Sequence, residues 1–348
     1  MRAAIVGTGF IGRVHALALQ AIGVEVAAVC GRTKQGAEAF GLGRVYDELE
    51  DLLERERIDA LHVCTPNAVH AGQAQAAIAR GIHVVCEKPL AVSPDESRAL
   101  LAAAEERGIV HATCYHVRGY PLVEQMRIDV TDGVVGEISF VHGRYLCDDV
   151  LFPASGWRVD PARSGSSYVV ADLGTHWLDL AEHVTGQHVT AVHCDFRSFG
   201  GGPLEDYAAL LLRFSRGAAG SVVLSAGASG RKNQLLFECE GTKAGLTWDQ
   251  ETPTEMLRRP ADGPRQIVVK DPATNSEPAA RLARYPAGHG EGYGEAFRNL
   301  FAGVYAAVEG QEHAPFPTFR EGHRGVATVA AAVRSARDGG WVDVEAEA

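Results

Sequence analysis

The 348-residue sequence lacks several features that would point to particular partners. It contains no cluster of lysine and arginine, and its formal net charge is -11. Because nucleic acids and anionic membranes attract clustered basic residues, neither is expected as a partner. No apolar run is long enough to cross a bilayer, and no basic and apolar leader follows Met1. We therefore expect a cytoplasmic protein that binds small molecules.

Cysteine is neither abundant nor regularly spaced. The seven cysteines are odd in number, and no two of them form a CxxC pair. This pattern argues against a disulfide framework and against a cysteine-based zinc site. Three of the first four lie in apolar, strand-like runs, so we expect reduced thiols in the core.

Short apolar runs alternate with helical stretches over the N-terminal part, as in RAAIV (2–6), GRVHALALQAI (12–22) and VEVAAVC (24–30). This pattern is typical of a doubly wound α/β domain with a parallel sheet, which we place at residues 1–121. After residue 121, strand-like runs follow one another across short turns, so residues 122–348 are predicted to form a second, mainly antiparallel domain. We expect one helix over 171–185 and an exposed meander over 258–290.

A glycine-rich loop follows the first predicted strand. Gly7, Gly9 and Gly12 have the spacing GxGxxG, and Phe10 and Ile11 complete the loop before a predicted helix. Gly7 permits a tight turn, Gly9 permits close approach of a pyrophosphate, and Gly12 permits close packing of the helix. A glycine-rich turn without a ligand is disfavoured because strand, loop and helix follow in the required order, so we predict a dinucleotide site.

The end of the second strand favours NADP over NAD. An NAD site usually has a carboxylate there for the ribose 2′-hydroxyl, but this chain reads AVCGRTK. Arg32 and Lys34, with Thr33 between them, are suited to a 2′-phosphate. Alternatively, Arg32 stacks on the adenine or points into water.

The stretch HVVCEKPLA (83–91) carries a lysine at the end of a predicted buried strand. Ligands bind at the carboxyl edge of such sheets, so Lys88 is expected to project toward the nicotinamide. Glu87 precedes it, and Pro89 ends the strand. A solvated surface charge is the alternative, and the fixed neighbours disfavour it.

The predicted helix at 171–185 has a polar stripe formed by Asp172, His176, Asp179 and His183. Asp172 precedes His176 by four residues, so its carboxylate can orient the imidazole for acid/base chemistry. For Asp179 and His183 a solvent-exposed face is an equal alternative. The four side chains spread over three turns, so a metal site is not predicted.

Four motifs together resemble the glucose-fructose oxidoreductase and inositol dehydrogenase family (Gfo/Idh/MocA): GTGFIG (7–12), CTPNAVH (64–70), CEKPLA (86–91) and DLGTHWLD (172–179). The resemblance implies an N-terminal Rossmann domain and a C-terminal α/β domain with a large open antiparallel sheet. The outer face of that sheet commonly forms the subunit interface, which implies a homodimer or homotetramer. It also implies NAD(P)-dependent hydride transfer at a secondary hydroxyl or carbonyl of a sugar, polyol or related carbohydrate.

The same resemblance assigns functions to individual residues. Lys88 matches the catalytic lysine of the family, Asp172 its substrate-contacting acid, and His176 its acid/base histidine. His116 stands where the family usually has asparagine, so contacts near the nicotinamide differ here. The cofactor is expected to contact the motif residues Glu87 and Lys88 and the loop residues Thr65, Pro66, Asn67 and His70.

Two assignments of the proton transfer remain open. In one, His176 takes the hydroxyl proton while Lys88 stabilises the developing oxyanion. In the other, Lys88 carries the proton and His176 positions the substrate.

Further candidates for substrate binding are polar and aromatic residues suited to a polyhydroxylated ring, and for each a surface-loop function is the alternative. They are His116, Arg118, Asp148, Asp149, Trp157 and Arg158. A catalytically silent dinucleotide-binding sensor is the alternative function. The joint presence of Lys88, Asp172 and His176 argues against it.

Overall fold

The computed structural model describes residues 1–151 and 156–345. They form two compact units. The first comprises Met1–His116 and Tyr293–Val326, and the second comprises Val117–Gly292 and the described residues from Ala327 onward. The sequence-based division had placed 293–326 in the second domain. No helix in the described part of the chain has the length and apolar character needed to span a bilayer.

The first unit is built on a six-stranded sheet in which every neighbouring pair is parallel. Its strand order, β3-β2-β1-β4-β5-β6, is that of a doubly wound nucleotide-binding domain and confirms the predicted fold. The strands are β1 Arg2–Val6, β2 Glu25–Cys30, β3 Arg44–Tyr46, β4 Ala60–Val63, β5 His83–Cys86 and β6 His111–Thr113.

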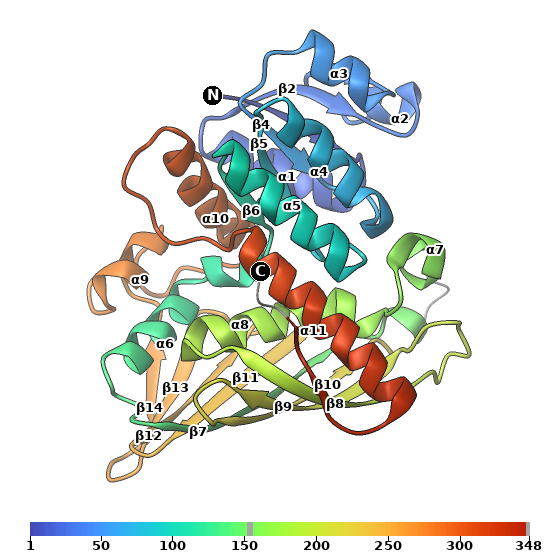
Figure 1. The fold of residues 1–348 in the computed structure, drawn as a ribbon. Helices are drawn as coiled ribbons and strands as arrows, with labels where there is room; N and C mark the ends of the chain where they lie inside the picture. The colour runs from blue at the N-terminus through green and yellow to red at the C-terminus, as the bar shows by residue number, and fades with distance from the viewer. Residues whose placement is uncertain (152–155, 346–348) are drawn as a thin grey trace. The chain divides into compact units, whose positions relative to one another are not determined.

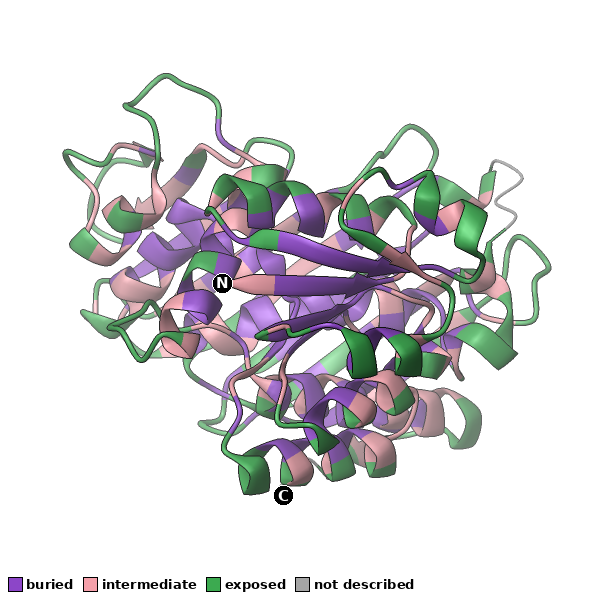
Figure 2. Ribbon diagram, turned by 90° about the horizontal axis from the view of Figure 1, so that it is seen from above, coloured by how far each residue is buried: buried purple, intermediate pink, exposed green. Residues whose placement is uncertain are grey.

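Helices cover both faces of this sheet, so the strands have apolar residues on both sides. Along β1, Ala3 and Ile5 belong to one buried cluster, whereas Ala4 and Val6 belong to the other. Figure 2 shows these strands buried and the outward helix faces exposed. The helices are α1 Phe10–Ala21, α2 Lys34–Glu38, α3 Leu49–Arg55, α4 His70–Ala79, α5 Pro94–Arg107, α10 Tyr293–Val308 and the first residues of α11 Phe319–Asp338.

The second unit is built on a nine-stranded sheet with the order β14-β13-β12-β11-β7-β10-β9-β8-β15 among the described residues. Within the described ranges, β7 and β10 are the only neighbours in this sheet that run parallel, and the other pairs are antiparallel. The predicted, mainly antiparallel sheet is therefore confirmed. The strands are β7 Ile138–Leu146, β8 Val189–Arg197, β9 Tyr207–Phe214, β10 Ala219–Ser225, β11 Gln234–Gly241, β12 Ala244–Asp249, β13 Glu255–Pro260, β14 Gln266–Val269 and β15 Val342–Asp343.

Figure 1 shows α6 and α8 on one face of this sheet. The other face has no helix in the described part of the unit. The expected meander over 258–290 is partly wrong, since it contains the end of β13, all of β14 and α9. The helices are α6 Pro121–Thr131, α7 Pro161–Ser164, α8 Thr175–Thr185, α9 Glu277–Leu282 and the remainder of α11.

Candidate active site

The glycine loop has the geometry that a bound dinucleotide requires. Gly7 has φ of 108°, and a Cβ atom on it would lie 2.3 Å from the carbonyl oxygen of Cys64. A Cβ on Gly12 would lie 2.2 Å from the carbonyl oxygen of Gly7. A Cβ on Gly9 would meet no protein atom within 4 Å, so the space in front of Gly9 is open to a ligand. Phe10 is exposed and Ile11 is partly buried at the start of α1, where free backbone N–H groups favour a phosphate.

The end of β2 presents basic and polar groups to solvent. Arg32, Thr33 and Lys34 are exposed, and the side chain of Thr33 caps α2 by accepting a 3.1 Å hydrogen bond from the N–H of Gly36. Burial raises the pKa of the Cys30 thiol to about 11, and the carboxylates of Glu48 and Asp47 add to this effect. The end of β2 therefore lies near both an exposed guanidinium and acidic side chains.

His70 connects two of the predicted cofactor loops. Its Nδ1 lies 2.9 Å from the carbonyl oxygen of Pro89, and its Nε2 lies 2.8 Å from that of Thr65. The Thr65 hydroxyl donates a 2.6 Å hydrogen bond to Gln73, and Asn67 is buried. Pro66 precedes the short helical turn Asn67–Val69. The structure therefore brings the loop at 64–70 together with the turn that follows Lys88.

Glu87 and Lys88 follow β5 directly, at the carboxyl edge of the parallel sheet. Lys88 is partly buried, and the Lys88–Pro89 peptide bond is cis. Glu87 is buried, and its Oε2 accepts a 3.2 Å hydrogen bond from the backbone N–H of Lys88. Burial is the largest effect and acts to raise the pKa of Glu87, but the interactions with His15, Lys88 and Cys114 together outweigh it and lower the pKa. The carboxylate beside Lys88 is therefore ionised at neutral pH.

His116 lies in the same unit as Glu87 and Lys88, and the charges of both residues act on its imidazole. Its ring stacks on Phe297 with centroids 4.5 Å apart and contacts Tyr293 edge-on at 4.7 Å. Burial lowers the pKa of His116 to about 3, although Glu87 opposes this effect. His116 is therefore neutral at physiological pH, which suits a contact residue better than a proton carrier.

Three residues predicted for substrate binding meet in the second unit. The Nε of Arg158 lies 3.2 Å from Oδ2 of Asp172, and its guanidinium carbon lies 5.0 Å from the centroid of the Trp157 ring. Asp172 retains 18% side-chain exposure and Arg158 retains 48%. An aromatic ring, a carboxylate and a guanidinium are thus available together, and this set matches the hydroxyl groups of a carbohydrate.

The predicted helix at 171–185 begins differently from the expectation. Val170–Gly174 forms a π-helical turn, and the regular helix α8 starts at Thr175 and ends before Gly186, whose φ is 63°. The wider turn displaces Asp172 from the 100° periodicity used to predict the stripe. His176 is buried, and its ring lies 6.2 Å from that of Tyr145.

Tyr145 lies beside the candidate residues His176 and Asp172, and the sequence did not reveal this. Its hydroxyl donates a 2.8 Å hydrogen bond to Asn233, and burial, followed by the Asp172 carboxylate, raises its pKa. The side chain lies on the helix-covered face of β7, next to His176. In the sequence, Tyr145 occupies an inward position of an alternating strand pattern. Periodicity alone does not distinguish a functional tyrosine at such a position from a core residue.

Arg118 and Asp179 form a buried ion pair. The Nε and Nη2 of Arg118 donate hydrogen bonds of 2.8 and 2.5 Å to the two carboxylate oxygens of Asp179. The predicted solvent-exposed alternative for Asp179 is therefore wrong. Contact between Arg118 and a substrate stays a prediction. Asp148 is also buried, and it accepts a 2.6 Å hydrogen bond from Lys232. The sequence did not reveal this pair. Asp149 is exposed.

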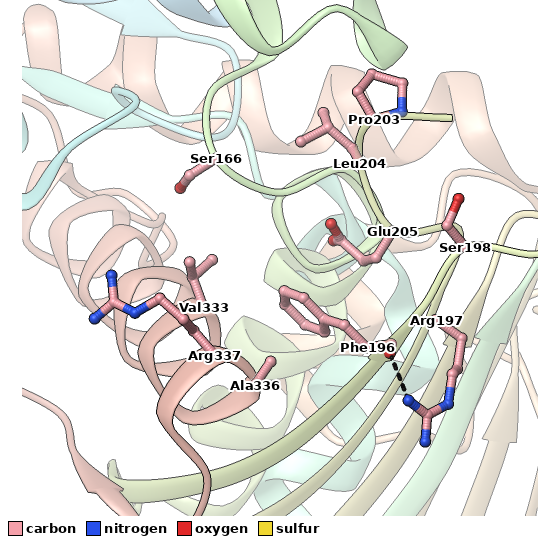
Figure 3. A pocket seen from close by; sticks show the side chains of 10 residues that line it. All are labelled: Ser166, Phe196, Arg197, Ser198, Pro203, Leu204, Glu205, Val333, Ala336 and Arg337. Carbon is pink, nitrogen blue, oxygen red and sulfur yellow. Dashed lines mark hydrogen bonds between the residues drawn. The ribbon is translucent and has the colours of Figure 1, made fainter. Parts of the chain in front are cut away.

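Glu205 holds the start of the π-helical turn. Its Oε1 accepts hydrogen bonds from the Ser167 hydroxyl and from the Tyr168 N–H, the latter at 2.9 Å. It also lines a pocket of about 350 Å³ near β8 and α11, shown in Figure 3. None of the predicted site residues that the structure describes lines this pocket. The contacts of Glu205 are therefore with the segment that leads to Asp172.

His183 joins α8 to α6 through Glu124, from which its Nε2 lies 3.5 Å away. Burial lowers the pKa of His183 to about 4, with Arg118 adding to this effect and Glu124 opposing it. Burial acts to raise the pKa of Glu124, but Arg127 and His183 outweigh it and hold the value at about 2.

Acidification is expected to destabilise the second unit through this pair. As the pH falls from 6.5 to 4, His183 becomes protonated in the unfolded chain but stays neutral in the folded protein. The free energy of unfolding therefore decreases over this range. Between pH 4.5 and 2 the loss of the Glu124 charge continues the fall. The shifted pKa of His183 accounts for a decrease of about 3 kcal/mol in the free energy of unfolding. Urea unfolding at pH 7 and pH 4 measures the pH dependence, and His183→Gln should reduce the difference by about 3 kcal/mol, because other buried histidines such as His62 and His116 contribute the rest. An equal difference in the variant contradicts the assignment.

Comparison with known proteins identifies the family. The model of the Gfo/Idh/MocA oxidoreductase family with an NAD-binding Rossmann fold matches residues 1–115, and that of the Gfo/Idh/MocA C-terminal domain matches residues 123–247. The solved structure of an inositol dehydrogenase homologue from Azotobacter vinelandii, in complex with NAD⁺, is 32% identical, with a TM-score of 0.90 over 99% of this chain and 97% of that chain. The chain belongs to the Gfo/Idh/MocA family.

Levoglucosan dehydrogenase of Pseudarthrobacter phenanthrenivorans is 27% identical to this Gfo/Idh/MocA member over 98% of the chain and 97% of that protein. A solved structure of levoglucosan dehydrogenase with NADH and levoglucosan has a TM-score of 0.92 and covers 100% of both chains at 27% identity. The predicted oxidoreductase function is thus confirmed, and the substrate class named for these relatives agrees with the prediction. A nicotinamide dinucleotide is confirmed as the cofactor type, whereas the preference for NADP stays a prediction.

Proposed function

We propose that this Gfo/Idh/MocA oxidoreductase transfers a hydride between a nicotinamide dinucleotide and a secondary hydroxyl or carbonyl of a sugar or polyol. The observation that supports it best is the position of Lys88, which follows β5 at the carboxyl edge of the sheet that also carries the glycine loop. The Trp157, Arg158 and Asp172 cluster supports a carbohydrate-like substrate.

The cofactor is assigned to the first unit. The N–H groups at the start of α1 and the open space at Gly9 suit its pyrophosphate. The loop at Thr65–His70 and the Glu87–Lys88 turn are assigned to its nicotinamide end. When bound, the nicotinamide ring accepts a hydride from the substrate carbon or donates one to it.

The acid/base chemistry is assigned to Lys88, Asp172 and His176. In the oxidation direction His176 removes the hydroxyl proton, the Lys88 ammonium stabilises the developing negative charge on oxygen, and Asp172 orients the substrate. The other assignment, in which Lys88 carries the proton, uses the same three side chains.

Turnover of purified protein with NAD⁺ or NADP⁺ and a panel of sugars and polyols tests this function. The panel includes levoglucosan and myo-inositol, because structures of relatives were solved with them. Formation of the reduced cofactor with at least one panel member is expected. Tight cofactor binding without turnover of any member would support a dinucleotide-binding sensor instead.

NADP is the proposed cofactor because Arg32 is exposed at the end of β2 and the AVCGRTK segment has no carboxylate. Arg32→Ala is expected to weaken NADPH binding about 10- to 100-fold, since a charge-assisted contact is worth about 1.5–3 kcal/mol, and to leave NADH binding nearly unchanged. Fluorescence titration with both reduced cofactors measures the two constants. Arg13→Ala is a matched control on the same unit, and equal losses for both cofactors contradict the assignment.

The proposed oligomer is a homodimer or homotetramer formed through the helix-free face of the nine-stranded sheet. Phe140, Leu211 and Val223 lie on this face and are 44%, 51% and 37% exposed. Large exposed apolar side chains in one patch are typical of an interface. Sedimentation velocity on the wild type tests this proposal.

A further inference from the structure

A row of buried polar side chains leads to Glu87 inside the first unit. The hydroxyl oxygen of Tyr305 lies 3.0 Å from Nε2 of His62. The Nδ1 of His62 lies 2.9 Å from Nδ1 of His15, and the Nε2 of His15 lies 3.0 Å from Oε1 of Glu87. The other carboxylate oxygen, Oε2, accepts the backbone N–H of Lys88.

None of these groups has appreciable access to water. His15 and His62 are 0% exposed, Tyr305 is 2% exposed and Glu87 is 7% exposed. The ring of Phe301 packs edge-on against both imidazoles, at centroid distances of 4.7 and 4.8 Å. Because buried polar groups without partners are costly, the hydrogen bonds among these side chains fix their orientations.

The ionised carboxylate of Glu87 fixes the direction of the hydrogen bond at its end of the row. The ionised carboxylate of Glu87 only accepts, so Nε2 of His15 carries a hydrogen and donates it. Burial, with His15 adding to it, lowers the pKa of His62, which is therefore neutral. The Nδ1 atoms of His62 and His15 face each other, so one of them donates to the other, and Nε2 of His62 faces the Tyr305 hydroxyl.

Two thiols also lie beside His15: the Sγ of Cys64 is 3.2 Å from its Nδ1, and the Sγ of Cys114 is 3.6 Å from its Nε2. His15, Glu87 and Cys114 together offer three metal-ligand atoms. However, burial and the nearby Glu87 carboxylate raise the pKa of the Cys114 thiol well above its ordinary value, so the thiol is neutral. A neutral thiol and a 3.0 Å contact between nitrogen and oxygen are typical of a hydrogen-bonded group rather than a metal centre.

We propose that His15 is a positioning residue for the reaction: held by His62 and Tyr305, it fixes the Glu87 carboxylate, and Glu87 fixes the backbone and the charge environment of Lys88. This inference rests on the proposed function, because it assigns Lys88 to the reaction. Both ends of the row are buried, so it does not conduct protons to solvent. It orients Glu87 instead.

His15 also keeps Glu87 ionised. Burial alone would raise the pKa of Glu87, and the hydrogen bond from His15 is the largest effect that opposes it. Removing that donor therefore raises the pKa of Glu87. If turnover requires the ionised carboxylate, the acidic limb of the kcat–pH profile moves to higher pH.

The experiment compares His15→Leu with His15→Gln. Leucine fills the space without a donor, whereas the glutamine Nε2–H can replace the imidazole N–H to Glu87. For His15→Leu we expect kcat to fall about 10- to 100-fold, as misplacement of a catalytic group does, with an acidic limb at higher pH and cofactor affinity within about threefold of wild type. For His15→Gln we expect most of kcat and the position of the limb to be restored.

His323→Leu is the matched control. His323 is a buried imidazole of the same unit, 2.8 Å from the Ser97 hydroxyl through Nδ1 and outside the proposed site. We expect it to lower stability without moving the acidic limb. An unshifted limb in His15→Leu, or failure of folded His15→Gln to restore turnover, would overturn the proposal.

A second measurement is independent of turnover. In ¹⁵N-histidine-labelled protein, we expect an exchange-protected Nε2–H signal from His15 that shifts in Glu87→Gln, a variant of nearly equal size that also tests the network if His15→Leu does not fold. Absence of this signal, or a stoichiometric zinc ion bound through Cys114, would overturn the inference. If the signal is present but the wild type turns over no substrate, the proposed function fails and the hydrogen-bonded row stands.

Discussion

Lys88→Ala is expected to lower kcat about 100- to 1000-fold, the loss typical of removing a group that stabilises charge in the transition state. Lys88 follows β5 at the carboxyl edge of the sheet, and its backbone N–H is held by the buried carboxylate of Glu87. Cofactor affinity should change much less, because the phosphate loop is unaffected. Steady-state kinetics with the best panel substrate and titration with the reduced cofactor separate the two effects.

Lys243→Ala is a suitable control for the loss of a positive charge. Lys243 lies at the turn between β11 and β12 in the second unit, and its Nζ contacts the carbonyl oxygen of Gly133 at 3.4 Å. This variant should retain wild-type kcat. Undiminished turnover in Lys88→Ala contradicts the function assigned to the lysine, and a larger loss in His176→Ala than in Lys88→Ala identifies His176 as the proton carrier.

The parts of the site that depend on local sequence were predictable. Gly7 and Gly12 must be glycine because of contacts with residues in the same turn or the adjacent strand end. The position of Lys88 after a buried strand and the parallel arrangement of the sheet followed from the alternation of apolar runs and amphipathic helices. Such features are recognisable from short motifs or regular periodicities, although the atom that excludes a Cβ on Gly7 belongs to Cys64, far along the chain.

The parts that depend on tertiary contacts were not predictable from patterns. Arg118 pairs with Asp179 across 61 positions of sequence, and Tyr145 bonds Asn233 across 88. Polar residues at such separations give no periodic signal, so Asp179 appeared compatible with a solvent-exposed face. The π-helical turn before α8 was missed for a related reason, because Glu205, 35 positions after Val170, helps to hold it.

The assignment of α10 to the first unit illustrates the same limit. Its apolar face is recognisable in the sequence, but its partner is not. Phe297 and Phe301 pack against the imidazole of His15 on α1, at centroid distances of 5.6 and 4.7 Å. The unit to which α10 belongs is therefore determined by the distant surface that its apolar face complements. The division by chain order alone placed this helix in the second domain, whereas it packs in the first unit.

Gly9→Ala is expected to weaken cofactor binding about 100-fold or more while the free energy of unfolding stays nearly unchanged. A Cβ at this position meets no protein atom within 4 Å, and the backbone is extended, with φ of -76° and ψ of -171°. The folded protein therefore accepts alanine. The added methyl group instead occupies space assigned to the pyrophosphate, so its cost appears only when the cofactor binds.

Gly7→Ala should give the opposite pattern. Its positive φ and the 2.3 Å approach of a Cβ to the Cys64 carbonyl oxygen strain the folded protein itself, at about 2–5 kcal/mol when the backbone and packing costs are combined. Gly72→Ala, in helix α4 with no atom within 4 Å of its Cβ, is the matched control and should alter neither property appreciably. Urea unfolding of the three variants measures the free energy of unfolding, and cofactor titration measures the affinity for the cofactor. If Gly9→Ala binds the cofactor like the wild type, the dinucleotide does not approach the backbone at Gly9, and the first turn of α1 is not its phosphate site.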